Sequence, residues 1–157
     1  MSLKLSNHEI ELGCVKVYVS IALLDKPLRV DTLPSINDSY AVVGLPSLEH
    51  AEPCKLALSY LYALEERVIG SRVKKTPILI LMNLLGVKQV RDVVERVGEA
   101  RAVVALGLDP GVSSVLIEVL KTVGYSVLSS ESSSFTKTVC RQELLEEITV
   151  PRISRLS

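Results

Sequence analysis

The segment at residues 76–98 constrains the fold more than any other part of the chain, because it predicts two short consecutive helices. Thr76 is a favourable N-cap, and Pro77 suits the first helical turn since its missing N–H has no helical partner there. The nearly uninterrupted apolar run that follows is typical of a helix buried on all sides. Gly86 ends this helix, and valines at helical spacing predict a second helix up to Gly98. We expect the helix at residues 77–85 to be the most buried element of the fold.

The length of 157 residues predicts a single domain over residues 1–157. Apolar residues make up 48% of the chain, but only five Tyr and one Phe are present, so the core must consist of Leu, Val and Ile. No apolar run is long enough to span a membrane, and the first ten residues lack the apolar core of a signal peptide. Three cysteines, Cys14, Cys54 and Cys140, lie far apart without a C-x-x-C motif. We therefore expect a cytoplasmic protein with buried free thiols and no membrane contact.

The first third of the chain predicts strands. Apolar and polar residues alternate over residues 14–24, which is typical of a half-buried strand. Residues 2–12 are its expected hairpin partner, with Gly13 near the turn. Chain breaks are expected at residues 25–27 and 36–38, and a short strand at residues 40–44. A helix at residues 49–68 and a loop at 70–72 follow.

The second half predicts a strand, a helix and a strand in succession. Residues 101–108 are apolar almost throughout, as in a central strand. Asp109-Pro110 caps a helix at residues 111–123 that Gly124 ends, and residues 125–128 are a strand able to pair in parallel. A serine-rich loop at 129–134, a helix at 139–148 and an edge strand at 149–156, interrupted by Pro151, complete the chain. The whole pattern predicts an α+β fold, with a small mixed β-sheet packed by helices.

The net charge is zero, but the positive charge is concentrated in one segment. Residues 67–101 carry eight Lys or Arg and three Asp or Glu, a net charge of +5, whereas residues 1–66 carry −4. This asymmetry is consistent with a local anionic partner, and equally with a solvated face balanced by the acidic first third.

Few residues point to catalysis. The chain contains no phosphate-binding glycine loop, nucleophile elbow or H-E-x-x-H metal motif. His8 and His50 are isolated and are expected at the surface, and the turn at residues 107–111 is more simply a capped turn than an anion site. The carboxylate pairs at 65–66 and 146–147 are interpreted as solvated helix faces. We expect no enzyme activity, no metal and no cofactor.

The order of motifs resembles a known family. Residues 70–73, the apolar helix before Gly86, the Lys88-Gln89-Val90 triplet and Gly98 resemble the small kinase-binding subunit of the KEOPS (EKC) complex, the TPRKB-like family. Residues 42–44, a helix bearing Ala63 and the final residues 144–156 fit the same order. Leucines at positions 79, 84 and 85 stand where the family has Glu and Ala-Ser.

This resemblance implies a non-catalytic subunit that binds the kinase-like ATPase of KEOPS and the CCA end of tRNA, and that supports threonylcarbamoyladenosine modification of tRNA. The tRNA-binding candidates are cations for phosphates and one amide for a base edge: Arg72, Lys74, Lys75, Lys88 and Gln89. The candidates for the kinase interface are Tyr62 and Leu145, on a face formed by the helix at 49–68 and the C-terminal helix. The alternative is a small-molecule-binding or regulatory α/β domain without nucleic acid, with its ligand near residues 107–111 and 129–134. A third possibility is a plain interaction scaffold.

Overall fold

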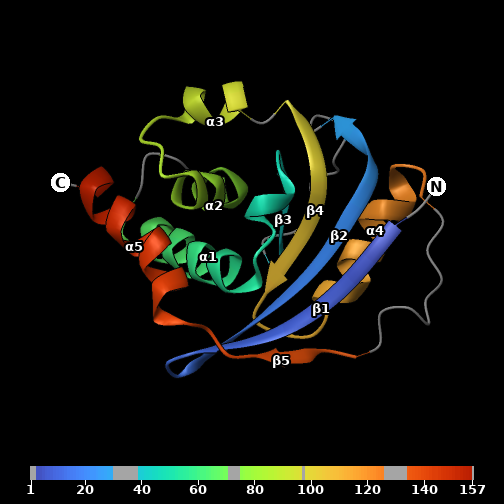
Figure 1. The fold of residues 1–157 in the computed structure, drawn as a ribbon, viewed down its shortest axis with the longest axis horizontal. Coiled ribbons are helices and arrows are strands. Elements are labelled where there is room, and N and C mark those ends of the chain that lie inside the picture. Colours follow the sequence, from blue (N-terminus) through green and yellow to red (C-terminus); the bar gives the residue numbers. More distant parts are fainter. Residues whose placement is uncertain (1–2, 30–38, 71–74, 97, 126–133, 157) are drawn as a thin grey trace.

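The computed structural model describes residues 3–29, 39–70, 75–96, 98–125 and 134–156. Five strands form one sheet in the order β3-β4-β2-β1-β5, and helices pack on both of its faces (Figure 1). The strands are β1 (Leu3–Leu12), β2 (Val15–Arg29), β3 (Ala41–Leu45), β4 (Glu99–Gly107) and β5 (Thr136–Thr138). The helices are α1 (Pro53–Val68), α2 (Thr76–Leu85), α3 (Val90–Arg96), α4 (Val112–Thr122) and α5 (Gln142–Leu156). The predicted α+β fold with a small mixed sheet is confirmed.

The N-terminal hairpin forms as predicted. Strands β1 and β2 pair antiparallel from Leu3–Leu24 to Leu12–Val15, and Gly13 takes a positive φ of 63° in the turn between them. The predicted break at residues 25–27 is wrong, because β2 continues to Arg29. Its pairing with β1 ends at Leu24, and its register with β4 shifts between Leu23 and Leu28.

Strand β4 lies between β3 and β2 and pairs antiparallel with both. Its even-numbered residues from Ala102 to Leu106 face the core shared with α1 and α2, whereas Val103 and Ala105 face the core shared with α4. All five are fully buried. The apolar run therefore has the predicted cause, a strand covered on both faces.

The mixed character of the sheet comes from an element that the sequence did not predict. Strand β5 pairs in parallel with β1, with His8 opposite Thr136. Its three residues are too few to give a detectable alternation. Of the strand predicted at 125–128, Tyr125 lies outside any strand and residues 126–128 lie outside the described residues. The described residues also exclude the predicted turn at 36–38, residues 71–72 and most of the serine-rich loop.

Helix α1 begins later than predicted. A single 3-10 turn occupies Leu48–His50, and Glu52 then takes an extended conformation as the N-cap of α1. Its carboxylate accepts a hydrogen bond of 2.8 Å from the Lys55 N–H, and Pro53 starts the helix, as Pro often does. Helix α4 agrees with the prediction for residues 111–123, and Gly124 follows it with a φ of 103°.

Helix α2 is buried, as its apolar sequence predicts. Six consecutive residues, from Leu79 to Leu84, are buried. Gly86 ends the helix in the left-handed conformation, with a φ of 68°. The N-cap position is Lys75 rather than the predicted Thr76. Helix α3 follows at Val90–Arg96 and inserts Val93 into the core.

The C-terminal segment differs most from the prediction. Residues 149–156 are not an edge strand, because α5 runs from Gln142 to Leu156 with Pro151 inside it. The β-branched residues and the proline favoured a strand, but contacts of this segment with α1, described below, favour a helix. None of the helices in the described part of the chain has the length and apolarity that a membrane crossing requires.

Candidate functional site

The loop between α2 and α3 presents the sequence-predicted Lys88 and Gln89. The Val87 N–H donates a 3.1 Å hydrogen bond to the Met82 carbonyl, which closes the end of α2. Val87 is buried, while Lys88 and Gln89 are exposed. A buried residue on each side of the loop, Val87 and Val93, therefore fixes a short segment whose polar side chains point to solvent.

An open hollow of about 550 Å³ lies beside this loop. Gly86, Val87 and Gln89 line it together with four charged residues: Lys88, Arg91, Asp92 and Glu95. Its charges are thus balanced, two basic and two acidic. Lys88 with Gln89 is the part of this surface able to offer a cation and an amide together.

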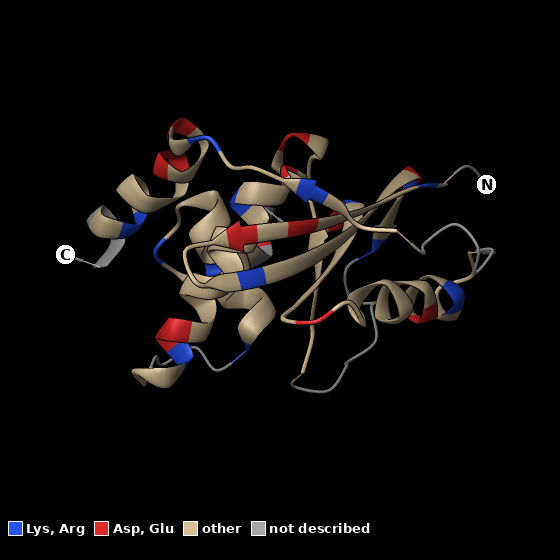
Figure 2. Cartoon of the chain, turned by 90° about the horizontal axis from the view of Figure 1, so that it is seen from below, with Lys and Arg blue, Asp and Glu red and all other residues tan. Residues whose placement is uncertain are grey.

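The predicted tRNA-binding residues are not all gathered at one place. Lys75 is exposed at the start of α2, whereas Lys88 follows its end, and the ten residues of the helix separate the two by about 15 Å. Arg72 and Lys74 lie outside the described residues. In Figure 2 the basic and acidic residues are intermixed over several elements. Of the predicted cations that the structure describes, Lys75 and Lys88 therefore lie at opposite ends of α2.

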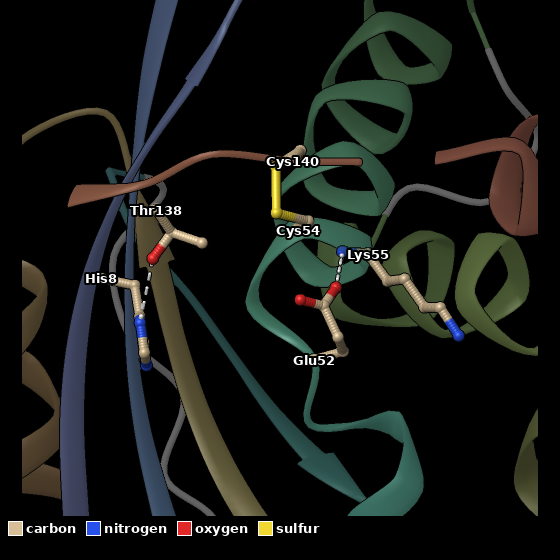
Figure 3. Close-up of a disulfide and its surroundings, with 6 residues drawn as sticks. All are labelled: His8, Glu52, Cys54, Lys55, Thr138 and Cys140. Carbon is tan, nitrogen blue, oxygen red and sulfur yellow. Dashed lines mark hydrogen bonds between the residues drawn. A yellow bond between two sulfur atoms is a disulfide. The ribbon is translucent and has the colours of Figure 1, made fainter. Parts of the chain in front are cut away.

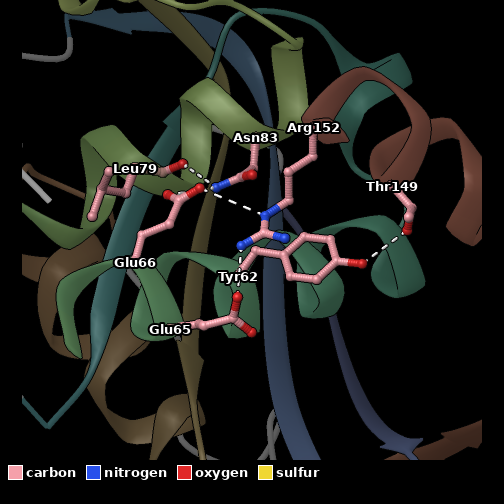
Figure 4. A network of polar contacts seen from close by, with 7 residues as sticks. All are labelled: Tyr62, Glu65, Glu66, Leu79, Asn83, Thr149 and Arg152. Atoms are coloured by element: carbon pink, nitrogen blue, oxygen red, sulfur yellow. Dashed lines mark hydrogen bonds and ion pairs between the residues drawn. The ribbon is translucent and has the colours of Figure 1, made fainter. Parts of the chain in front are cut away.

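The two predicted partner-binding residues lie where α1 and α5 meet. The Tyr62 hydroxyl is 2.9 Å from the Thr149 Oγ1, and the Arg152 guanidinium carbon lies 4.0 Å from the centre of the Tyr62 ring (Figure 4). Leu145 is partly buried against the main core. Both side chains therefore contribute to the packing of α5 on α1, and each is only partly exposed.

A buried polar network continues from this contact. Glu66 is only 3% exposed, so its interpretation as part of a solvated face is wrong. Its Oε1 lies 3.6 Å from the Arg152 Nε, and its Oε2 accepts a 3.2 Å hydrogen bond from the Asn83 Nδ2. The same amide nitrogen donates to the Leu79 carbonyl at 2.9 Å. One signal was available in the sequence, because Glu66 is three residues after the buried Ala63 and therefore shares its helix face.

The neighbouring carboxylates are more exposed. Glu65 lies 2.8 Å from the Arg152 Nη2 and keeps more than half of its side chain in solvent. Glu147, on α5, forms an ion pair with Lys55 near the start of α1. Arg152 thus contacts both members of the 65–66 pair, and α5 is joined to α1 at both ends of their contact.

The expectation of buried free thiols is also wrong. Cys54 and Cys140 form a disulfide with Cα atoms 5.7 Å apart (Figure 3), and Cys14 is free but exposed. The two bonded cysteines are 86 residues apart in sequence, so no local pattern could have indicated their pairing.

Histidine 8 is half-buried rather than at the surface. Its Nε2 lies 3.1 Å from the Ser6 Oγ and its Nδ1 lies 3.4 Å from the Thr138 Oγ1 of β5. Burial lowers the pKa of His8 because it disfavours the imidazolium, and the carboxylate of Glu52 partly offsets this effect.

His50 pairs with the neighbouring Glu49 at 3.7 Å. In the described part of the chain, no three His, Cys, Asp or Glu side chains form a metal-binding group.

The turn at residues 107–111 is a capped turn, as its simpler interpretation predicted. The Asp109 Oδ1 accepts hydrogen bonds from the Tyr40 hydroxyl at 2.6 Å and from the Gly111 N–H at 2.8 Å. These bonds lower the pKa of Asp109, and the bond to Asp109 raises the pKa of Tyr40. A Cβ at Gly107 would meet the Tyr40 ring at 2.7 Å. The Tyr40 ring therefore lies directly against Gly107.

Comparison with known proteins adds no further assignment. No family model matches the chain, and no curated protein matches it significantly.

Proposed function

We propose that this chain is the non-catalytic subunit of a KEOPS complex, which binds the kinase-like ATPase subunit and the CCA end of tRNA. In this role it supports threonylcarbamoyladenosine modification of tRNA without performing chemistry. The observation that carries the proposal is the exposed Lys88-Gln89 pair on a loop anchored by Val87 and by the positive φ of Gly86.

The chemistry of this loop fits a single-stranded RNA end. A lysine ammonium neutralises phosphate, and a glutamine amide both donates and accepts at a base edge. The hollow beside the loop is open to solvent and is lined by Lys88 and Gln89, so a flexible strand can reach both side chains. Asp92 and Glu95 at the hollow repel phosphate, which favours a path over the Lys88 side.

The proposed kinase face is formed by α1 and α5. Val150 and Ile153 on α5 are 62% and 63% exposed, and Val68 near the end of α1 is 86% exposed. Contiguous exposed apolar patches are typical of surfaces that a protein partner covers, and we propose that these side chains form such a patch. Tyr62 and Leu145, both partly exposed, are the residues that we propose as its anchors.

The test of tRNA binding compares Lys88→Ala and Gln89→Ala with Lys121→Ala, an exposed lysine on α4. Gel shifts with intact and CCA-trimmed tRNA over a salt series measure the affinities. Lys88→Ala is expected to weaken all tRNAs and to reduce the salt slope by about one. Gln89→Ala is expected to weaken the binding only of tRNA with an intact CCA end. Lys121→Ala is expected to leave the affinity for both tRNAs unchanged.

A triple alanine variant of Lys74, Lys75 and Lys88 extends this test to both ends of α2. If it is folded by circular dichroism and binds tRNA as well as the parent, the tRNA part of the proposal is wrong. The kinase part is tested by calorimetry with the KEOPS kinase from the same source. We expect one-to-one binding, and no binding at micromolar concentration would contradict it.

A further inference from the structure

We propose that the Cys54–Cys140 disulfide is a redox latch that holds α5 on the body of the domain. Cys54 is the second residue of α1, and Cys140 lies between the end of β5 at Thr138 and the start of α5 at Gln142. The bond therefore fixes the segment that leads into α5 to the first turn of α1 (Figure 3).

Helix α5 has little apolar contact of its own. Among its side chains that the structure describes, those of residues 142–153, Ile148 is the one that is fully buried. The remaining apolar positions are partly or largely exposed, as Val150 and Ile153 show. A helix with so small a buried face depends on other restraints to remain in place.

The described polar contacts of α5 with the rest of the fold reach a single element. Glu147 pairs with Lys55 of α1. Thr149 contacts Tyr62, and Arg152 pairs with Glu65 and Glu66, which are also on α1 (Figure 4). These polar contacts lie along one helix, while Ile148 and Leu145 provide the apolar contact of α5 with the main core. The disulfide lies at the N-terminal end of this contact and keeps the two helices together.

The two cysteines differ in burial, and this difference determines which sulfur a reductant attacks. Cys54 is 1% exposed, whereas Cys140 is only partly buried. One thiolate of a small dithiol attacks the Cys140 Sγ, the Sγ–Sγ bond breaks, and Cys54 leaves as a thiolate that takes up a proton. The second thiol of the reductant then attacks the mixed disulfide and releases Cys140. The protein disulfide gains two electrons and two protons, and the dithiol becomes a disulfide.

Release of α5 has consequences beyond the helix itself. Its Pro151 lies against Gly86, where an added Cβ would come within 3.3 Å of the proline Cβ. Gly86 precedes the loop that carries Lys88 and Gln89, so the latch also stabilises that loop. If α1 and α5 form the kinase face, a step that rests on the proposed function, reduction weakens kinase binding as well.

The experiment measures hydrogen exchange by mass spectrometry in a Cys14→Ser background, which removes the exposed free thiol. The oxidised protein is compared with protein fully reduced by dithiothreitol, with intact mass confirming the reduction. We expect amides of α5 to exchange at least about tenfold faster after reduction, while those of α4 and β4 are unchanged. A Cys140→Ser variant in the same background should exchange like the reduced form and not respond to dithiothreitol.

Three results would overturn the latch. The first is a count of two free thiols in the non-reduced Cys14→Ser protein, which would mean that the bond is absent. The second is α5 exchange that does not change on complete reduction. The third is an equal increase of the exchange rates in α4, β4 and α5, which would show that the disulfide stabilises the whole fold and not α5 in particular. Kinase affinity is measured separately on both forms: equal affinity together with faster α5 exchange contradicts the kinase face and leaves the latch supported.

Discussion

The guanidinium group of Arg152 lies 4.0 Å from the centre of the Tyr62 ring, and its Nε lies 3.6 Å from the buried carboxylate of Glu66. One cation from α5 therefore covers an aromatic ring and offsets a buried negative charge on α1. Its Nε is buried without a hydrogen-bond partner among the described residues, so the ion pair is the main compensation for its desolvation.

Arg152→Ala is expected to lower the free energy of unfolding by about 3 kcal/mol, because it leaves Glu66 buried without its cation. Urea denaturation measures the change. Glu65→Gln is the matched control, since it removes the exposed half of the same interaction and should cost less than about 1 kcal/mol. Equal costs for the two variants would show that the burial of Glu66 does not determine the effect.

Gly86→Ala is expected to destabilise the protein by about 1–2 kcal/mol, because an L side chain at a φ of 68° is strained. The added methyl group also meets Pro151 of α5 at 3.3 Å. Gly98→Ala serves as the control, since nothing lies within 4 Å of its Cβ position. Thermal denaturation of the two variants distinguishes them, and a Gly86→Ala protein as stable as Gly98→Ala would contradict the strain.

The stability of the domain is expected to fall as the pH decreases below about 6.5, the ordinary pKa of His8. Burial lowers the folded-state pKa of His8, so the unfolded chain binds the proton first and acid favours unfolding. The contribution is fully present above the unfolded pKa and is lost as the pH falls through the folded one. His8→Gln should reduce this slope in urea denaturations from pH 5 to 8, and an unchanged slope would assign it to other groups.

Tyr40→Phe is expected to raise the pKa of Asp109, because it removes the hydrogen bond that contributes most to stabilising the carboxylate. Titration of the Asp109 carboxyl carbon by NMR measures this shift. In Tyr18→Phe, which removes a 3.0 Å hydrogen bond to Glu9, the Asp109 titration should remain that of the parent. A Tyr40→Phe protein with an unshifted Asp109 would contradict the geometry of the turn.

Part of the candidate site could be predicted from the sequence. Gly86 marks the end of an apolar helix, so the exposure of Lys88 and Gln89 follows from local spacing. The separation of Lys75 from Lys88 could also be anticipated, since a helix between two residues fixes their distance. Glu66 was interpreted wrongly because a charged residue on a buried face is stable only when a partner is supplied, and that partner, Arg152, is 86 residues away.

The sequence by itself determined the elements that local interactions control. The β1–β2 hairpin follows from alternation and Gly13, α2 from its apolar run and glycine stop, and α4 from its amphipathic spacing. The tertiary structure alone decided the Cys54–Cys140 bond, the parallel addition of β5 to β1 and the helix through Pro151. These features depend on contacts between residues far apart in the chain, whose free energies exceed weak local preferences, so they are defined only in the folded domain.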